Sequence, residues 1–304
     1  MDLKKYQGVI PAFYACYDEQ GEISRERSAA LARMLVNKGV KGLYVGGSSG
    51  ECIYLEKEER MAMLEAVMAE VKGECTVIAH VACNNTRESC QLAAHAESLG
   101  VDAIASIPPI YFHLPEYAIA AYWNAMSAAA PNTDFIIYNI PQLAGVALTP
   151  SLFREMRKNP RVIGVKNSSM PTYDLEIWRR LGGENLAVFN GPDEQFVAGR
   201  VTGASGGIGG TYAVMPELFL KMNKWIEAGQ LSRAEAIQHE VNSIIEEMCS
   251  AHGNMYAVAK GILQINDGLP CGSVRAPLAP LADSDLPIVE KVAAHIREAV
   301  ARFA

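Results

Sequence analysis

The feature that most constrains the fold is a regular alternation between short apolar segments and longer segments with the period of an α-helix. Segments of helical period lie at 25–38, 57–71, 86–99, 115–129 and 171–181. Eight short apolar segments alternate with them, at 8–15, 42–45, 75–81, 101–107, 135–138, 161–165, 186–189 and 204–208. Parallel strands need crossover helices, so this alternation predicts an α/β fold, a closed (β/α)8 TIM barrel.

A doubly wound open sheet is the alternative architecture for the same alternation. Open sheets that bind dinucleotides carry a G-x-G-x-x-G motif after a strand, and none of the predicted strands is followed by one. The closed barrel is therefore the preferred prediction.

After residue 215 the chain has helical period throughout, at 216–228, 232–249, 255–265 and 285–303, with a Pro/Ala/Leu-rich connector at 272–281. One helix is enough to complete the eighth unit, so the others form a carboxy-terminal helical extension. We expect a barrel core over 1–215 and helices over 216–304 that pack on it and complete a single domain.

Charge and composition exclude several classes of protein. The chain has 34 acidic and 27 basic side chains, and it has no basic stripe that would neutralise nucleic-acid phosphates. It has no apolar run of membrane length, and residues 1–8 contain no apolar stretch that could be a signal segment, so we expect a soluble cytoplasmic protein. Its seven cysteines lack Cys-x-x-Cys spacing and its six histidines lack ligand spacing. We therefore expect neither a disulfide framework nor a metal site.

Lys166 directly follows the apolar run 161–165, at the tip of a predicted buried strand. Loss of water disfavours the ammonium form of such a side chain, and the neutral amine can attack a ketone to form a Schiff base. The alternative is a strand-end lysine that simply reaches solvent. The residues at the other strand ends decide between the two.

Polar residues follow two other predicted strands, and in a (β/α)8 barrel such residues meet at one mouth. Ser48 and Ser49 follow the second strand among glycines. This loop is suited to bind a carboxylate and relay a proton, although a Gly/Ser cluster is also typical of a turn. Tyr138 ends the fifth strand and is expected beside Lys166. Its alternative is a core tyrosine with a satisfied hydroxyl.

Acidic and glycine-rich segments follow the last two predicted strands. Asp193 and Glu194 come shortly after Gly191, where acids either cap a helix or accept hydrogen bonds from a polyol. The glycine-rich loop 206–212 either binds phosphate, as in many barrels, or lets a ligand approach the backbone closely.

The segments GGSSGE, YNIP, GVKNSS, GPDE and GGIGGTY occur in this order along the chain. Their order and spacing resemble the N-acetylneuraminate lyase/dihydrodipicolinate synthase family of class I aldolases over the whole length. The resemblance implies a (β/α)8 barrel and a homotetramer built from two tight dimers. It also implies a covalent Schiff base between a lysine and pyruvate, with no other cofactor and no metal.

By this resemblance, Lys166 is the amine that condenses with pyruvate and Tyr138 is the phenol that transfers protons. The loop of Ser48 and Ser49 binds the carboxylate of pyruvate, with Ser48 close to Tyr138. Tyr111 matches the family tyrosine that reaches toward the site of a neighbouring subunit. The candidate residues for the sugar end are Ser168, Gly191, Asp193, Glu194, Ile208, Gly210 and Tyr256, the last where lyases place an aromatic ring over the sugar.

The branch of the family is read from a few positions. Dihydrodipicolinate synthases carry an arginine two residues after the proline of YN-x-P, and this chain has Leu143 there, as sialic acid lyases do. Two positions depart from those lyases: Gly210 stands where they often have serine, and Ser168 replaces a threonine. We expect a lyase that splits a 2-keto sugar acid into pyruvate and an aldose. The preferred substrate is N-acetylneuraminate, which would give N-acetylmannosamine.

Other functions stay open at this point. Within the superfamily they are a 2-keto-3-deoxy-sugar-acid aldolase or dehydratase and, behind it, dihydrodipicolinate synthase. From another class, the glycine-rich loop 206–212 suggests a phosphosugar isomerase or a non-catalytic phosphate-binding barrel.

Overall fold

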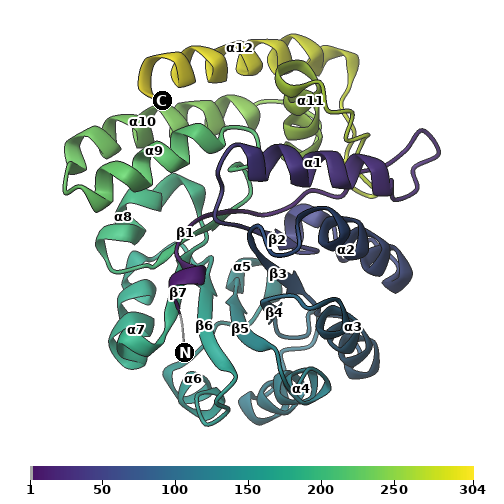
Figure 1. Cartoon of the computed structure of the whole chain (residues 1–304), viewed down its shortest axis with the longest axis vertical. Helices are drawn as coiled ribbons and strands as arrows, with labels where there is room; N and C mark the ends of the chain where they lie inside the picture. Colours follow the sequence, from purple (N-terminus) through teal and green to yellow (C-terminus); the bar gives the residue numbers. More distant parts are fainter. Residues whose placement is uncertain (1–2) are drawn as a thin grey trace.

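The computed structural model describes residues 3–304. Within this range the chain forms a barrel of eight parallel strands in the order β1-β8-β7-β6-β5-β4-β3-β2 (Figure 1). The strands are β1 (Gly8–Pro11), β2 (Gly42–Val45), β3 (Thr76–His80), β4 (Ala103–Ser106), β5 (Asp134–Asn139), β6 (Val162–Asn167), β7 (Ala187–Asn190) and β8 (Gly206–Gly209). Each lies at a segment predicted from the sequence, so the predicted (β/α)8 barrel is confirmed.

The barrel closes where β1 meets β2. The N–H of Lys41 donates to the carbonyl of Val9 over 2.9 Å, and the N–H of Phe13 donates to the carbonyl of Tyr44 over 2.9 Å. The prediction of a first strand over 8–15 is too long, because β1 ends at Pro11. The apolar residues that follow β1 are buried without extending the strand: the N–H of Ala12 donates to the carbonyl of Gly209 over 2.9 Å, and farther along the N–H of Tyr17 donates to the carbonyl of Cys271 over 3.0 Å.

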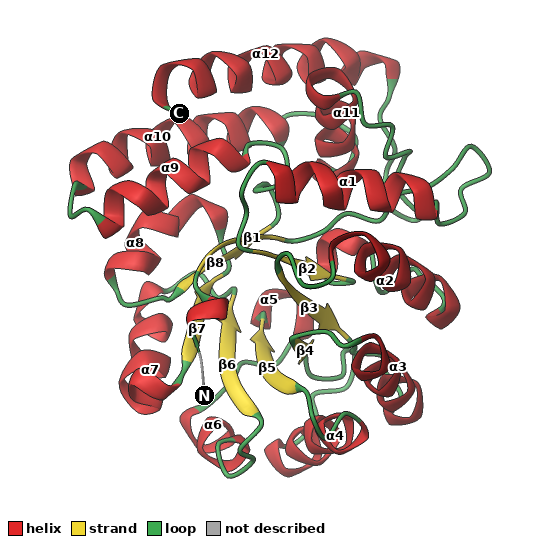
Figure 2. Ribbon diagram, viewed as in Figure 1, coloured by secondary structure: helices red, strands yellow, loops and turns green. Residues whose placement is uncertain are grey.

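Helices surround the strands, as the red and yellow ribbons of Figure 2 show. The predicted crossover helices are confirmed as α1 (Arg25–Asn37), α2 (Lys57–Val71), α3 (Thr86–Leu99), α4 (Glu116–Ala129) and α7 (Thr172–Gly182). Three more were not predicted: α5 (Pro141–Ala144), α6 (Pro150–Met156) and α8 (Phe196–Val201). They contain four, seven and six residues, which is too short for a helical period to show in the sequence. Short 3₁₀ turns lie at η1 (Lys4–Tyr6), η2 (Ser48–Gly50), η3 (Gly183–Asn185), η4 (Asp193–Gln195) and η5 (Asp283–Asp285).

The end of the chain is helical, as predicted. Its helices are α9 (Pro216–Glu227), α10 (Leu231–Met248), α11 (Met255–Asp267) and α12 (Leu286–Phe303). They lie together on the side of the barrel that carries β1 and α1, with α12 outermost (Figure 1). α9 packs against β1 and α10, and α12 packs against α10 and α11. The division of the chain at 215/216 stays a prediction.

Two apolar cores hold the barrel together. One fills the space between the strands and the helices. The other fills the barrel interior, where alternate residues of each strand point inward. Its members include Ile10, Tyr44, Ile78, Ile136, Tyr138, Ile163, Phe189 and Ile208. Within residues 3–304, no helix is long and apolar enough to cross a membrane.

Candidate active site

A cavity of about 240 Å³ opens at the carboxyl ends of the strands. It collects residues from β5, β6 and β8, from the loops after β2 and β7, and from α11. Among the residues that line it are Ser48, Ser49, Tyr138, Lys166, Ser168, Gly191, Asp193, Glu194, Ile208, Gly210 and Tyr256. Every site residue predicted from the sequence except Tyr111 therefore lies at one pocket.

Lys166 lies near the end of β6 and is only 4% exposed. Its Nζ lies 3.9 Å from the centroid of the Tyr138 ring and 4.3 Å from that of the Tyr44 ring. Burial lowers the pKa of this amine to about 7, while the negative charge of Asp193 acts in the opposite direction. The neutral, nucleophilic form of Lys166 is therefore well populated near neutral pH.

Tyr138 pairs with Lys166 in the register of β5 and β6. Its ring packs edge-on against the rings of Tyr44 and His80, with centroid separations of 5.8 and 5.9 Å. Burial raises the pKa of Tyr138 to about 12, while hydrogen bonds with Ser48 and Ser168 act to lower it. The phenol thus keeps its proton at neutral pH and is linked by hydrogen bonds to both sides of the pocket.

Tyr44 and His80 belong to this cluster, and reasoning from the sequence missed both. The Tyr44 hydroxyl is buried and has no hydrogen-bond partner among the described residues. His80 Nε2 accepts a hydrogen bond from the N–H of Ile107 over 3.4 Å, so Nδ1 carries the proton and donates it to the carbonyl of Gly46 over 2.9 Å. Burial holds the pKa of His80 well below its usual value. The sequence does contain a signal for both residues, because each is a polar aromatic side chain at an inward-facing position of an otherwise apolar strand.

The loop after β2 contains η2, which carries the two predicted serines. Glycine is required at position 47, because a Cβ there would lie 2.6 Å from the ring of Tyr44. Ser49 is buried, and its hydrogen bond with Tyr256 acts to lower a tyrosine pKa that burial raises overall. The loop therefore contacts the phenol cluster on one side and α11 on the other.

Asp193 holds the loop after β8 in place. One carboxylate oxygen accepts from the N–H and the hydroxyl of Thr211, both over 2.6 Å, and the other accepts from the N–H of Gly210 over 3.2 Å. Burial raises the pKa of Asp193 to about 6. Glu194 is exposed and lies at the mouth of the pocket. The acidic pair thus divides into one residue that fixes a loop and one that faces the opening.

The glycines after β8 also serve different purposes. A Cβ on Gly209 would lie 2.1 Å from Asp193 Oδ1 and from the Tyr212 ring, so this glycine is required for packing. A Cβ on Gly210 would meet Ser49 Oγ at 3.4 Å, an ordinary contact. Because the N–H groups of Gly210 and Thr211 already bind a carboxylate, this loop is poorly suited to bind a phosphate.

Tyr111 does not reach this pocket within its own chain. It follows β4, is 86% exposed and has a φ of 81°, a conformation that non-glycine residues rarely adopt. Its ring packs edge-on against Phe112, with centroids 5.0 Å apart. Together with Tyr117 these residues line a separate hollow on the surface. The predicted contact of Tyr111 with a neighbouring subunit stays a prediction.

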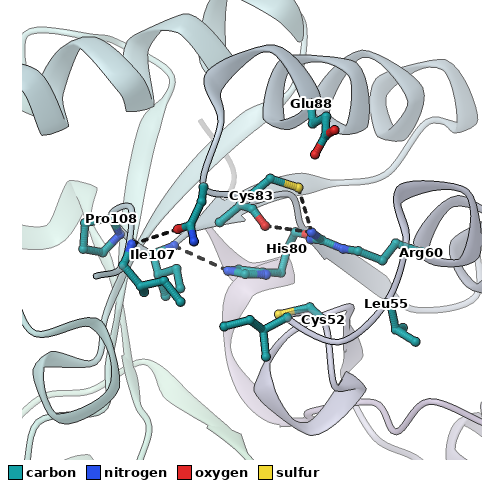
Figure 3. A pocket seen from close by; sticks show the side chains of 12 residues that line it. Cys52, Leu55, Arg60, His80, Cys83, Glu88, Ile107 and Pro108 are labelled. Carbon is teal, nitrogen blue, oxygen red and sulfur yellow. Dashed lines mark hydrogen bonds between the residues drawn. The ribbon is translucent and has the colours of Figure 1, made fainter. Parts of the chain in front are cut away.

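A second pocket lies beside the phenol cluster and is lined by His80 and Arg60 (Figure 3). The buried guanidinium of Arg60 donates to the carbonyls of His80 and Ala82, each over 2.7 Å, and to Cys83 Sγ. These bonds fix the end of β3 and hence the imidazole that packs on Tyr138. Lys166 is not among the residues that line this pocket.

No group of three or more His, Cys, Asp or Glu side chains within residues 3–304 is arranged to hold a metal ion. All seven cysteines are free.

A buried amine at the end of a barrel strand, paired with a phenol, is an arrangement suited to Schiff-base chemistry on a carbonyl compound. Residues 5–296 match the dihydrodipicolinate synthetase family, and the chain belongs to that family of class I pyruvate aldolases. The family predicted from the sequence is thus confirmed.

Several relatives are similar over almost their full length. The N-acetylneuraminate lyase of Mediterraneibacter gnavus is 64% identical over 99% of this chain and 96% of its own length. The N-acetylneuraminate lyase of Salmonella agona is 33% identical over 97% of this chain and 98% of its own length. The solved structure of the wild-type sialic acid aldolase of Ruminococcus gnavus has a TM-score of 0.98 at 64% identity, covering 99% of this chain and 100% of that one. A structure of CdNal from Clostridium difficile in complex with mannosamine has a TM-score of 0.89 at 28% identity and covers both chains fully.

Proposed function

We propose that this chain cleaves N-acetylneuraminate to pyruvate and N-acetylmannosamine through a covalent Schiff base on Lys166. The observation that carries the proposal is the buried amine of Lys166, 3.9 Å from the ring of Tyr138 and with a pKa of about 7. The choice of substrate is supported by the N-acetylneuraminate lyases that are 64% and 33% identical to the chain.

The reaction begins with the neutral amine of Lys166, which adds to the keto carbon of the open-chain substrate to give a carbinolamine. Tyr138 donates its proton to the departing hydroxyl, which leaves as water, so a protonated imine and a phenolate form side by side. The positive imine stabilises the phenolate, which otherwise has a high proton affinity in this buried place.

Carbon–carbon cleavage follows from the same pair of groups. The phenolate takes the proton from the hydroxyl on the carbon that becomes the aldehyde, and the bond between that carbon and its neighbour on the pyruvate side breaks. The bonding electrons move toward the imine nitrogen and give a neutral enamine, while the aldose leaves. Tyr138 then protonates the enamine carbon, which gives a protonated imine and a phenolate. Water hydrolyses this imine to pyruvate and the free amine, and the phenolate takes the proton that hydrolysis releases. No metal or further cofactor is needed for this sequence.

The two ends of the substrate are assigned to opposite sides of the pocket. The loop of Ser48 and Ser49 binds the pyruvate carboxylate, and Ser48 supports Tyr138 in its proton transfers. The sugar hydroxyls lie toward Glu194, with Asp193 holding the loop that forms the adjacent wall. Further contacts with the sugar end come from Ser168, Gly191, Ile208, Gly210 and Tyr256.

Leu143 supports the sugar-acid branch over dihydrodipicolinate synthase. It lines the pocket mouth, 63% exposed, from α5, whose Gln142 donates to the carbonyl of Ser168 over 2.6 Å. A dicarboxylic substrate pair would bring a second carboxylate there without a cationic partner. A 2-keto-3-deoxy-sugar-acid aldolase is the second candidate, favoured by the missing side chain at Gly210.

We also infer a homotetramer made of two tight dimers. The exposed aromatic residues Tyr111, Phe112 and Tyr117 support an interface between subunits on that face. Action in the cytoplasm, expected from the sequence, stays a prediction.

Trapping with borohydride tests the covalent step. Incubation with pyruvate and borohydride is expected to add one adduct, on the peptide that contains Lys166, and Lys166→Ala is expected to abolish it. An adduct on Lys260 or another lysine, with Lys166 unmodified, would contradict the assignment.

Pyruvate release from a panel of keto acids tests the substrate. We expect release from N-acetylneuraminate and negligible condensation of pyruvate with aspartate semialdehyde. Efficient use of aspartate semialdehyde would overturn the branch, and activity only on a shorter keto-deoxy acid would favour the second candidate.

A further inference from the structure

A fully buried ion pair joins Glu51, at the end of the serine loop, to Lys260 of α11. Lys260 Nζ donates to Glu51 Oε1 over 2.7 Å, and the two side chains are 1% and 0% exposed. The residues are 209 positions apart in the sequence. Two charges removed from water are a costly arrangement for stability alone, because apolar side chains of similar size often serve as well.

Glu51 is placed where the serine loop ends. It follows η2, and its backbone has a φ of 54°, in the left-handed region that a non-glycine residue rarely adopts. Its N–H donates to the carbonyl of Ser48 over 3.0 Å and completes the turn that carries Ser48 and Ser49. A strained residue of this kind persists only where its surroundings hold it.

The surroundings that hold Glu51 come from three other parts of the chain. Its Oε2 accepts from the Tyr17 hydroxyl over 3.0 Å and from the N–H of Arg275 over 2.6 Å. Lys260 also donates to the carbonyl of Ser273 over 2.6 Å. The carboxylate therefore links the serine loop to the segment after β1, to α11 and to the connector that follows α11.

α11 also carries Met255 and Tyr256, which line the pocket. The ion pair thus joins the serine loop to the helix that forms part of the pocket wall, in addition to the hydrogen bond between Ser49 and Tyr256. Figure 1 shows α11 beside α1, on the same side of the barrel as β1 and β2.

We propose that Glu51 and Lys260 are positioning residues, which hold the serine loop in the geometry that binds the carboxylate of the keto acid. This inference rests on the proposed function, because it assigns the loop to that carboxylate. Neither residue contacts the substrate. Their effect is on the affinity for pyruvate and leaves the reactivity of Lys166 intact.

Three variants and one matched control test the inference. Lys260→Met leaves Glu51 buried without its cation, and Glu51→Gln removes the charge of the carboxylate. The double variant Glu51→Gln/Lys260→Met contains neither charge. The control is Lys38→Met, because Lys38 also pairs with a carboxylate of α11, Asp267, over 2.7 Å, away from the serine loop.

Each protein is treated with increasing pyruvate and borohydride, and the initial rate of adduct formation on Lys166 gives a half-saturating pyruvate concentration and a maximal rate. Thermal melting is recorded alongside. We expect Lys260→Met and the double variant to raise the half-saturating concentration by about tenfold to about 10²-fold, the scale of an ångström-sized misplacement. The maximal rate is expected to fall by a smaller factor, through the loss of support from Ser48 to Tyr138, and Lys38→Met is expected to resemble the wild type.

The melting temperature distinguishes an effect on the position of the serine loop from an effect on the stability of the fold. The double variant is expected to regain melting temperature relative to Lys260→Met, because no unpaired charge is left buried, while its half-saturating concentration stays high. If Lys260→Met does not fold, the double variant carries the test.

A double variant with wild-type half-saturation would overturn the inference and leave the proposed function intact. An equal rise in Lys38→Met would also overturn it, since the effect would then be a general loosening of α11. Absence of any adduct on Lys166 in the wild type would overturn the proposed function and this inference with it.

Discussion

The amine of Lys166 lies 3.9 Å from the centroid of the Tyr138 ring, and the two residues are partners in the register of β5 and β6. Strand pairing therefore places the two side chains next to each other at the carboxyl ends of neighbouring strands. In the proposed mechanism, the imine gains its positive charge as the phenol loses its proton a few ångströms away, so each charge stabilises the other.

The rate of imine formation is expected to depend on pH through Lys166. Because the pKa of this amine is about 7, the neutral fraction falls about tenfold per pH unit below that value and reaches a plateau above about pH 8. Trapping with cyanoborohydride at saturating pyruvate measures the profile. A rate that still climbs about tenfold between pH 8 and pH 9, as for an exposed lysine, would contradict a buried amine.

Lys166→Met is expected to be more stable than the wild type. The folded-state pKa is lowered from 10.5 to about 7, so folding releases a proton that the unfolded chain keeps. The resulting penalty is on the order of 4 kcal/mol at neutral pH, is complete below about pH 7 and disappears as pH rises through the unfolded value. Urea unfolding at pH 7 and pH 10 measures it. A methionine variant that is no more stable at pH 7 would argue against the shift.

Tyr138→Phe is expected to reduce turnover by about 10²–10⁴-fold, the usual contribution of a positioned acid–base group. After long incubation with pyruvate, the yield of the adduct on Lys166 should equal that of the wild type, because the amine is unchanged. Pyruvate release and adduct mass give the two readouts. The matched control is Tyr173→Phe, an exposed tyrosine of α7, and similar turnover in both variants would make Tyr138 a core residue only.

Asp193→Asn and Glu194→Gln are expected to fail in different ways. Asp193 accepts three hydrogen bonds from the loop after β8. Its amide variant should therefore lose about 1–3 kcal/mol of unfolding free energy and bind every substrate more weakly. Glu194→Gln should keep wild-type stability and raise KM for the sugar acid only. Melting curves and KM for both substrates distinguish them, and a Glu194→Gln effect on pyruvate trapping would reject its place at the sugar end.

Gly209→Ala and Gly210→Ala form a pair of neighbouring variants with opposite expectations. The added Cβ at 209 would overlap Asp193 and Tyr212 at 2.1 Å, whereas at 210 it meets Ser49 at 3.4 Å. We expect about 1–3 kcal/mol of destabilisation for the first, typical of overpacking, and near wild-type stability for the second. Chemical denaturation measures both, and equal losses would contradict this account of the loop.

The sequence predicted the barrel because eight apolar segments alternate with helical ones, and it predicted Lys166 and Tyr138 because parallel strands end at one mouth. The same logic did not find Tyr44 or His80. Their role depends on which inward-facing rings meet across the barrel, and that requires the strand register and closure. Nor does any local pattern reveal that Asp193 binds Thr211, because the contact exists only once the loops after β7 and β8 lie side by side.

The short helices show the other limit of sequence reasoning. α5 contains four residues, fewer than two turns, so no periodicity marks it. The pairing of Glu51 with Lys260 is invisible for a different reason. It spans 209 positions, and either residue alone would be read as an ordinary surface charge.

The place of α11 in the chain also orders events during biosynthesis. A ribosome that has made residues up to β8 has supplied all eight strands and Lys166, but it has not yet made Tyr256 or Lys260. At that point the polypeptide lacks part of the pocket wall and the cation that pairs with Glu51. The pocket is complete only once the last sixth of the chain has been made, so a prematurely terminated product has Lys166 but lacks the wall that α11 contributes.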